Sequence, residues 1–131
     1  MYLNEEYAEI GHRLIETLPE FDDIKEAEVS IAYLSSDKEK KTAHKKVLGE
    51  CRKVDTNYTW CCPFDFLIVI YEQNIAGFDD KQIETLIRHE LHHIGVEMTN
   101  TGYGFYIVPH DIEEFYEILF DCGYDWSDVN G

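Results

Sequence analysis

The segment from Asp79 to Met98 constrains the fold of this chain most strongly, because it predicts one amphipathic helix. Its apolar residues recur at helical spacing, at Ile83, Ile87, Leu91, Ile94 and Met98. This spacing is typical of a helix that buries one face in a core. Asp79 or Asp80 can cap the first turn, where backbone N–H groups need an acceptor. We therefore expect a half-buried helix against which the rest of the chain packs.

The same segment contains the pattern His-Glu-x-x-His, formed by His89, Glu90 and His93. Residues four apart share one face of a helix, so both imidazoles can reach one metal ion. Glu90 lies about 100° round the helix from His89 and can hold a water bound to that ion. A zinc peptidase needs these groups: two neutral nitrogen ligands, an open coordination position and a base. A histidine pair at this spacing can also be ordinary polar helix surface.

A catalytic zinc usually has three protein ligands and one water, so a third ligand is expected elsewhere in the chain. The metzincin pattern fails, because Val96 and Thr99 stand where it requires glycine and histidine. We favour His110, since an imidazole at the mouth of a rigid helix suits zinc. Glu113 is the alternative, as in the gluzincin pattern, where a glutamate on a later helix completes the site.

The remaining elements predict a small mixed sheet between helices. A helix is expected from Asn4 to Leu18, strands at 29–34 and 65–72, a weaker strand at 47–54 and a short strand at 105–108. A last helix should begin at Pro109 and end near Gly123. We expect one α+β domain over residues 1–131, in which the sheet packs against the N-terminal helix, the motif helix and the C-terminal helix.

The charge of the chain excludes some classes of protein. A formal net charge of −16 disfavours binding to nucleic acid, because phosphate recognition relies on Lys and Arg. Most basic residues fall between Lys38 and Lys53, which we interpret as a solvated loop. The longest apolar run, Phe66 to Tyr71, is too short to cross a bilayer, and the N-terminus lacks the pattern of a signal peptide.

The four cysteines, Cys51, Cys61, Cys62 and Cys122, show no paired CxxC spacing. We expect them to be free, partly buried thiols in a reducing cytoplasm.

Three segments together resemble the phage-type metallopeptidase family: Phe66–Ile70, Ile83–Gly95 with the motif, and His110–Phe115. More distantly, the chain is similar to SprT-like and WLM zinc proteases. The resemblance covers roughly residues 29–122 and implies a minimal zincin-like fold in a bacterial or phage-infected cell. It implies Zn²⁺ held by His89, His93 and His110, with Glu90 as the catalytic base and a protein or peptide as substrate. The zinc ribbon and the basic tail that SprT-like proteases often carry are missing, which argues against DNA-linked substrates.

Details of substrate handling are less constrained by the sequence. The strand at 65–72, or a neighbouring edge, could pair with an extended peptide. Tyr103 and Tyr106 are possible hydrogen-bond donors to a developing oxyanion. His92 points away from the apolar stripe on a helical wheel and is interpreted as solvated surface.

Two function classes without catalysis compete with the peptidase. The strong negative charge is typical of an acidic interaction protein, such as a phage-encoded inhibitor that mimics DNA, in which zinc only stabilises the fold. The other class is a structural zinc module, in which protein rather than water fills the fourth coordination position.

Overall fold

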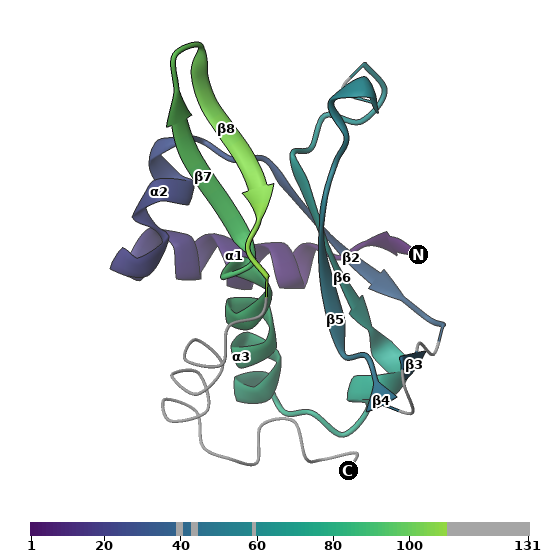
Figure 1. The fold of residues 1–131 in the computed structure, drawn as a ribbon. Helices are drawn as coiled ribbons and strands as arrows, with labels where there is room; N and C mark the ends of the chain where they lie inside the picture. Colours follow the sequence, from purple (N-terminus) through teal and green to yellow (C-terminus); the bar gives the residue numbers. More distant parts are fainter. Residues whose placement is uncertain (39–40, 43–44, 59, 110–131) are drawn as a thin grey trace.

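The computed structural model describes residues 1–38, 41–42, 45–58 and 60–109 (Figure 1). These residues form a small α+β domain, which confirms the predicted fold class. The helices are α1 (Glu5–Thr17), α2 (Asp22–Glu26) and α3 (Asp80–Leu91), with short 3-10 turns η1 (Pro19–Phe21), η2 (Thr56–Tyr58) and η3 (Glu72–Ile75). The strands are β1 (Tyr2–Leu3), β2 (Ile31–Ser36), β3 (Lys41–Thr42), β4 (Lys45–Lys46), β5 (Gly49–Lys53), β6 (Phe66–Tyr71), β7 (Ile94–Thr99) and β8 (Gly102–Ile107). The last helix predicted from Pro109 to Gly123 lies almost wholly outside the described residues.

The main sheet has the strand order β1-β2-β6-β5. Strands β2 and β6 are parallel, whereas β1 and β5 pair antiparallel to their neighbours, so the sheet is mixed as predicted. Strand β6 is central, and all its side chains except that of Leu67 are buried. Such a continuous apolar run is typical of a strand covered on both faces. Because β5 is the last strand in this order, it forms one edge of the sheet among the described residues.

Helix α1 follows the prediction closely. The Asn4 side chain caps it by accepting a hydrogen bond of 3.1 Å from the Tyr7 backbone N–H, and Pro19 follows soon after its last residue. Gly11 lets this helix approach β2, because a Cβ at this position would lie 2.2–2.4 Å from atoms of the Tyr33 ring. The absence of a side chain at Gly11 is therefore required for this contact between helix and sheet.

Helix α3 begins as predicted but ends earlier. Asp79 caps it, in a capping box where Asp79 and Gln82 exchange hydrogen bonds of 2.8 and 2.9 Å. The prediction that the helix continues through Ile94 to Met98 is wrong, because these residues form β7. The backbone tightens after Leu91, where the His93 N–H bonds to the Glu90 carbonyl three residues back at 3.0 Å.

A hairpin of β7 and β8 extends beyond the end of α3, and the segment between β5 and β6 extends in the same direction (Figure 1). A turn at Asn100 and Thr101 joins the two strands of this hairpin, and β8 is longer than the predicted strand at 105–108. Within the described ranges, no helix has the length and apolar character needed to cross a membrane.

Candidate active site

The end of α3 brings the three motif side chains together below the protein surface. His89, Glu90 and His93 are only 6%, 4% and 5% exposed. The His89 and His93 rings lie with their centroids 5.0 Å apart and their planes nearly perpendicular. The pair thus stays adjacent although His93 lies in the turn after the helix rather than on it.

His93 is oriented by the strand that returns from the hairpin. Its Nδ1 lies 2.6 Å from the Val108 carbonyl oxygen, and the Val108 N–H donates to the His93 carbonyl at 2.7 Å. Because a carbonyl only accepts hydrogen bonds, Nδ1 must carry the proton, and in the neutral ring the lone pair is on Nε2. That nitrogen is buried. Histidines that bind metals are commonly oriented by such a bond from their other nitrogen.

The histidine pair fits two positions of a zinc site. With Zn–N bonds of about 2.0–2.1 Å and tetrahedral angles, two imidazoles on one zinc have ring centroids about 5 Å apart. The observed separation of 5.0 Å matches this value. In the described part of the chain, no cluster of three or more His, Cys, Asp or Glu residues could hold a metal ion. His110 and Glu113, the two predicted candidates for the third ligand, lie outside the described residues.

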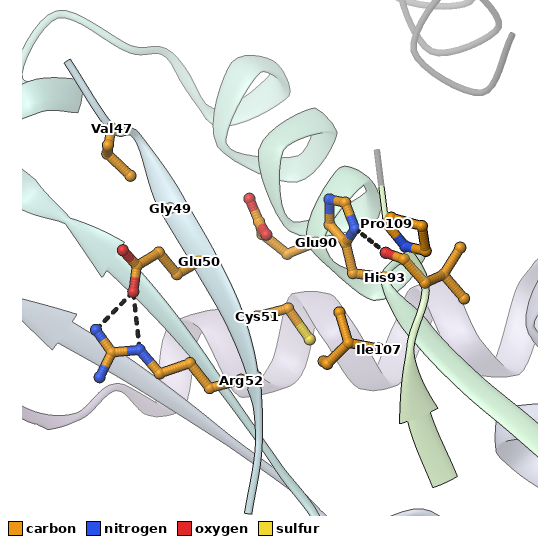
Figure 2. A pocket seen from close by; sticks show the side chains of 10 residues that line it. Val47, Gly49, Glu50, Cys51, Arg52, Glu90, His93, Ile107 and Pro109 are labelled. Carbon is orange, nitrogen blue, oxygen red and sulfur yellow. Dashed lines mark hydrogen bonds and ion pairs between the residues drawn. The ribbon is translucent and has the colours of Figure 1, made fainter. Parts of the chain in front are cut away.

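Glu90 and His93 line a pocket of about 310 Å³ that β5 closes on one side (Figure 2). The opposite wall is the end of β8 with the two residues that follow it. Burial, and to a lesser degree the negative charge of Glu50, raises the pKa of Glu90 to about 8. A carboxyl group in this position therefore holds its proton more strongly than an exposed glutamate, and a bound cation nearby would oppose this effect.

Two small residues of β5 shape the pocket around Glu90. A Cβ at Gly49 would lie 3.2 Å from Glu90 Oε2, so the glycine leaves room for the carboxylate. Cys51 lines the same wall, where burial and the charge of Glu90 raise the pKa of its thiol to about 12. The Cys51 thiol is therefore neutral near pH 7. Sequence reasoning found β5 as a strand but not its place beside Glu90.

A second pair on β5 is charged. The Arg52 guanidinium bonds to the Glu50 carboxylate through Nε at 2.8 Å and through Nη2 at 2.5 Å. Both residues line the pocket, so its wall contains a paired positive and negative charge. Cys51, Cys61 and Cys62 are free thiols as predicted, but only Cys51 and Cys62 are partly buried, whereas Cys61 is exposed; Cys122 lies outside the described residues.

Arg88 and His92, which lie beside the three motif residues, attach the end of α3 to η1. Arg88 makes a bidentate ion pair with Glu20, at 2.7 and 3.0 Å, and His92 Nε2 lies 3.2 Å from the same carboxylate. The His92 ring also packs on Phe21 at a centroid distance of 4.9 Å. The prediction that His92 is solvated surface is wrong, since its side chain is only 20% exposed. Glu20 is 68 residues from Arg88, and nothing in the sequence indicated this pairing.

The two tyrosines suggested as oxyanion donors do not line this pocket. Tyr106 packs over Gly95, its cross-strand partner, and faces a separate hollow beside α2. Tyr103 lies near the hairpin tip. The described residues of the pocket wall thus give no support to either tyrosine as a donor.

The family model described as "Putative phage metallopeptidase" matches residues 1–130. No curated protein and no solved structure matches the chain.

Proposed function

Because the chain belongs to the phage metallopeptidase family, we propose that it is a zinc-dependent peptidase that hydrolyses a peptide bond in a protein. Membership of this family implies a metal and a protein substrate. The observation that carries the proposal is the site itself: the buried Glu90 shares a pocket with His93, whose ring lies 5.0 Å from that of His89. A pocket lined by a carboxyl group and one imidazole, with a second imidazole directly beside the first, is suited to metal-assisted hydrolysis.

His89 and His93 would hold the zinc together with His110. The support for His110 is the path of the chain, since Pro109, the residue before it, lines the pocket with His93. Glu113 is the alternative third ligand. When bound, zinc polarises the scissile carbonyl and lowers the pKa of its water to about 7.

Glu90 would act as the general base. Its carboxylate would accept a proton from the attacking water and later donate it to the nitrogen of the leaving amine. The burial of Glu90 supports this role, because a shielded carboxyl with a raised pKa can both accept and release a proton near neutral pH. Because Gly49 has no side chain, the space beside Glu90 Oε2, the oxygen that would exchange the proton, stays open.

The substrate would bind as an extended strand along β5. The strand at 65–72 was one predicted partner, but β6 is paired with β2 on one side and with β5 on the other. Strand β5 is an edge of the sheet among the described residues, and four of its five residues line the pocket. Backbone groups at a sheet edge can bind an extended peptide by strand addition.

The test compares the wild-type protein with Glu90→Gln and His93→Ala. Zinc is measured by mass spectrometry after dialysis, and hydrolysis is measured on a peptide library made by digesting a bacterial proteome. We expect the wild type and Glu90→Gln to retain about one zinc per chain, and His93→Ala to lose it. Hydrolysis should fall by about 10²-fold or more in Glu90→Gln.

Two results would contradict this scheme. Cleavage at the wild-type rate by Glu90→Gln would exclude Glu90 as the base. Equal cleavage after complete removal of zinc would exclude a metal-dependent reaction.

The net charge of −16 supports a second candidate, an acidic protein that binds a basic partner. Binding to such a partner should weaken with salt and should be unchanged in Glu90→Gln. Salt-sensitive binding without any hydrolysis by the wild type would favour this candidate over the peptidase.

A further inference from the structure

One face of the β7–β8 hairpin is apolar along its whole length. The residues on this face pair across the two strands as Ile94 with Ile107, Val96 with Phe105, and Met98 with Tyr103. Because side chains alternate along a strand, these three pairs lie on the same face. The opposite face carries glycine and polar residues, including Gly95, Glu97 and Thr99, together with the Tyr106 ring. The hairpin therefore has one apolar face and one mixed face.

The base of the apolar face is anchored in the core, and its tip is exposed. Ile94 is buried, and the Phe105 ring packs on the Phe66 ring at a centroid distance of 6.0 Å. At the tip, Met98 is 72% exposed and Tyr103 is 46% exposed. The core thus fixes the direction of this face but does not cover its outer pair. Exposed methionine and tyrosine side chains on one surface are typical of binding sites.

The apolar face is continuous with the active-site pocket. Ile107, which is 38% exposed, lines that pocket together with Glu90, His93 and Cys51 (Figure 2). Tyr103 stands four residues before Ile107 on the same strand face, which is about 14 Å at the rise of a β-strand. An extended substrate covers this length with about four residues.

The charges around this surface favour a particular class of substrate. Neither β7 nor β8 contains Lys or Arg, and the whole chain has a net charge of −16. In the pocket wall, Glu90 stands beside Glu50, and the Arg52 guanidinium is paired with Glu50. The net negative charge of the chain would repel an acidic segment and attract a basic one, whereas a neutral segment would be little affected.

We infer that Met98 and Tyr103 bind apolar side chains of the protein substrate about three to four residues from the scissile bond. This inference rests on the proposed function and names its substrate class: extended segments in which apolar residues stand among neutral or basic ones. The apolar side chains contact the exposed end of the hairpin face, while the scissile bond lies beside Glu90. A substrate strand presents alternate side chains to one face, which matches the spacing of the pairs.

The test measures peptide binding in the Glu90→Gln variant, which separates binding from turnover. One probe is a fluorescein-labelled decapeptide in which Leu alternates with Lys, and the second carries Ser in place of every Leu. Both probes have the same charge, so the difference in fluorescence anisotropy reports apolar contact alone. We expect the Leu probe to bind about tenfold more tightly. Adding Met98→Ser and Tyr103→Ser should abolish this preference, and Glu97→Ser, on the opposite face, should retain it.

Three results would overturn the inference. Equal affinity for both probes in Glu90→Gln would exclude an apolar contact, and a preference that survives Met98→Ser with Tyr103→Ser would place the contact elsewhere. A dimer in sedimentation experiments that these two substitutions dissociate would mean that a second copy of the chain covers the surface. Failure of the proposed function gives a different result: the wild type would cleave no peptide of the library, while the Leu probe would still be preferred.

Discussion

Replacing Glu90 by Gln should change how the stability of the metal-free protein depends on pH. Burial, helped by the negative charge of Glu50, raises the pKa of Glu90 to about 8, whereas a glutamate in an unfolded chain titrates near pH 4.3, about its ordinary value. Between these values the folded protein keeps a proton that the unfolded chain has released. The free energy of unfolding should therefore fall as the pH rises, by about 1.4 kcal/mol per pH unit.

The size of this effect follows from the interval between the two pKa values. Over the whole interval, Glu90 can change the free energy of unfolding by at most roughly 5 kcal/mol. This contribution to stability is fully present below about pH 4.3 and is lost as the pH rises to about 8. The pocket beside Glu90 is open to solvent on one side, and water that enters it stabilises the charged carboxylate. We therefore expect a loss of about 2–3 kcal/mol.

The assay is urea unfolding followed by circular dichroism, with a chelator present, at several pH values between about 4.5 and 9. The difference between the wild type and Glu90→Gln isolates the contribution of Glu90, because other titrating groups are common to both proteins. The wild type should lose stability relative to the variant as the pH rises, and the difference should level off above about pH 8. If the free energy of unfolding changed with pH in the same way in both proteins, Glu90 would not have a raised pKa and the reasoning would be refuted.

Two glycine substitutions, with a third as a control, test the packing around the site and the core. Gly49→Ala would add a Cβ at 3.2 Å from Glu90 Oε2, so we expect about 1–2 kcal/mol lower stability and about tenfold lower kcat/KM on a cleaved library peptide. Gly104→Ala, where the Cβ would meet surface side chains at 3.2–3.3 Å, should change neither quantity, and equal losses in both variants would contradict this account. Gly11→Ala would place its Cβ within 2.4 Å of the Tyr33 ring and should cost about 3 kcal/mol in urea unfolding. A cost below about 0.5 kcal/mol would show that the helix shifts without penalty.

The sequence was sufficient to predict the elements with strong local signals. The cap at Asp79 or Asp80, the helix that begins at Asn4 and the apolar run of β6 each follow from neighbouring residues, and the structure confirms them, with Asp79 as the cap. The adjacency of His89 and His93 was also predicted correctly, because a spacing of four residues keeps two side chains close whether the last turn is α-helical or tighter.

The end of α3 could not be predicted from periodicity. Ile94, Val96 and Met98 alternate with polar or small residues, so part of the stretch that continues the helical stripe also satisfies the period of a strand. Pairing with β8 decides between the two, and that pairing is a tertiary contact. Gly95 offered a local signal, since glycine weakens a helix, and here it makes room for the Tyr106 ring.

The walls of the pocket also depend on long-range contacts. Gly49 and Cys51 have no chemical pattern that identifies them, and only the pairing of β5 with β6 places them beside Glu90. The attachment of Arg88 and His92 to Glu20 is similar, because their partner lies in η1, the 3-10 turn after α1. The chemistry of the site was therefore visible in the sequence, whereas its surroundings were not.

The matched strand lengths of the β7–β8 hairpin determine where the chain returns to His93 at Val108. Both of its ends are joined at the base by the hydrogen bonds between His93 and Val108, and each residue from Ile94 to Thr99 has a partner on β8. Lengthening both strands equally would move only the tip and leave the base in register. Deleting a single residue from either strand would reverse its alternation, so that Ile107 would turn away from the pocket and Val108 would no longer meet His93. Homologous proteins should therefore vary the length of this hairpin in matched steps.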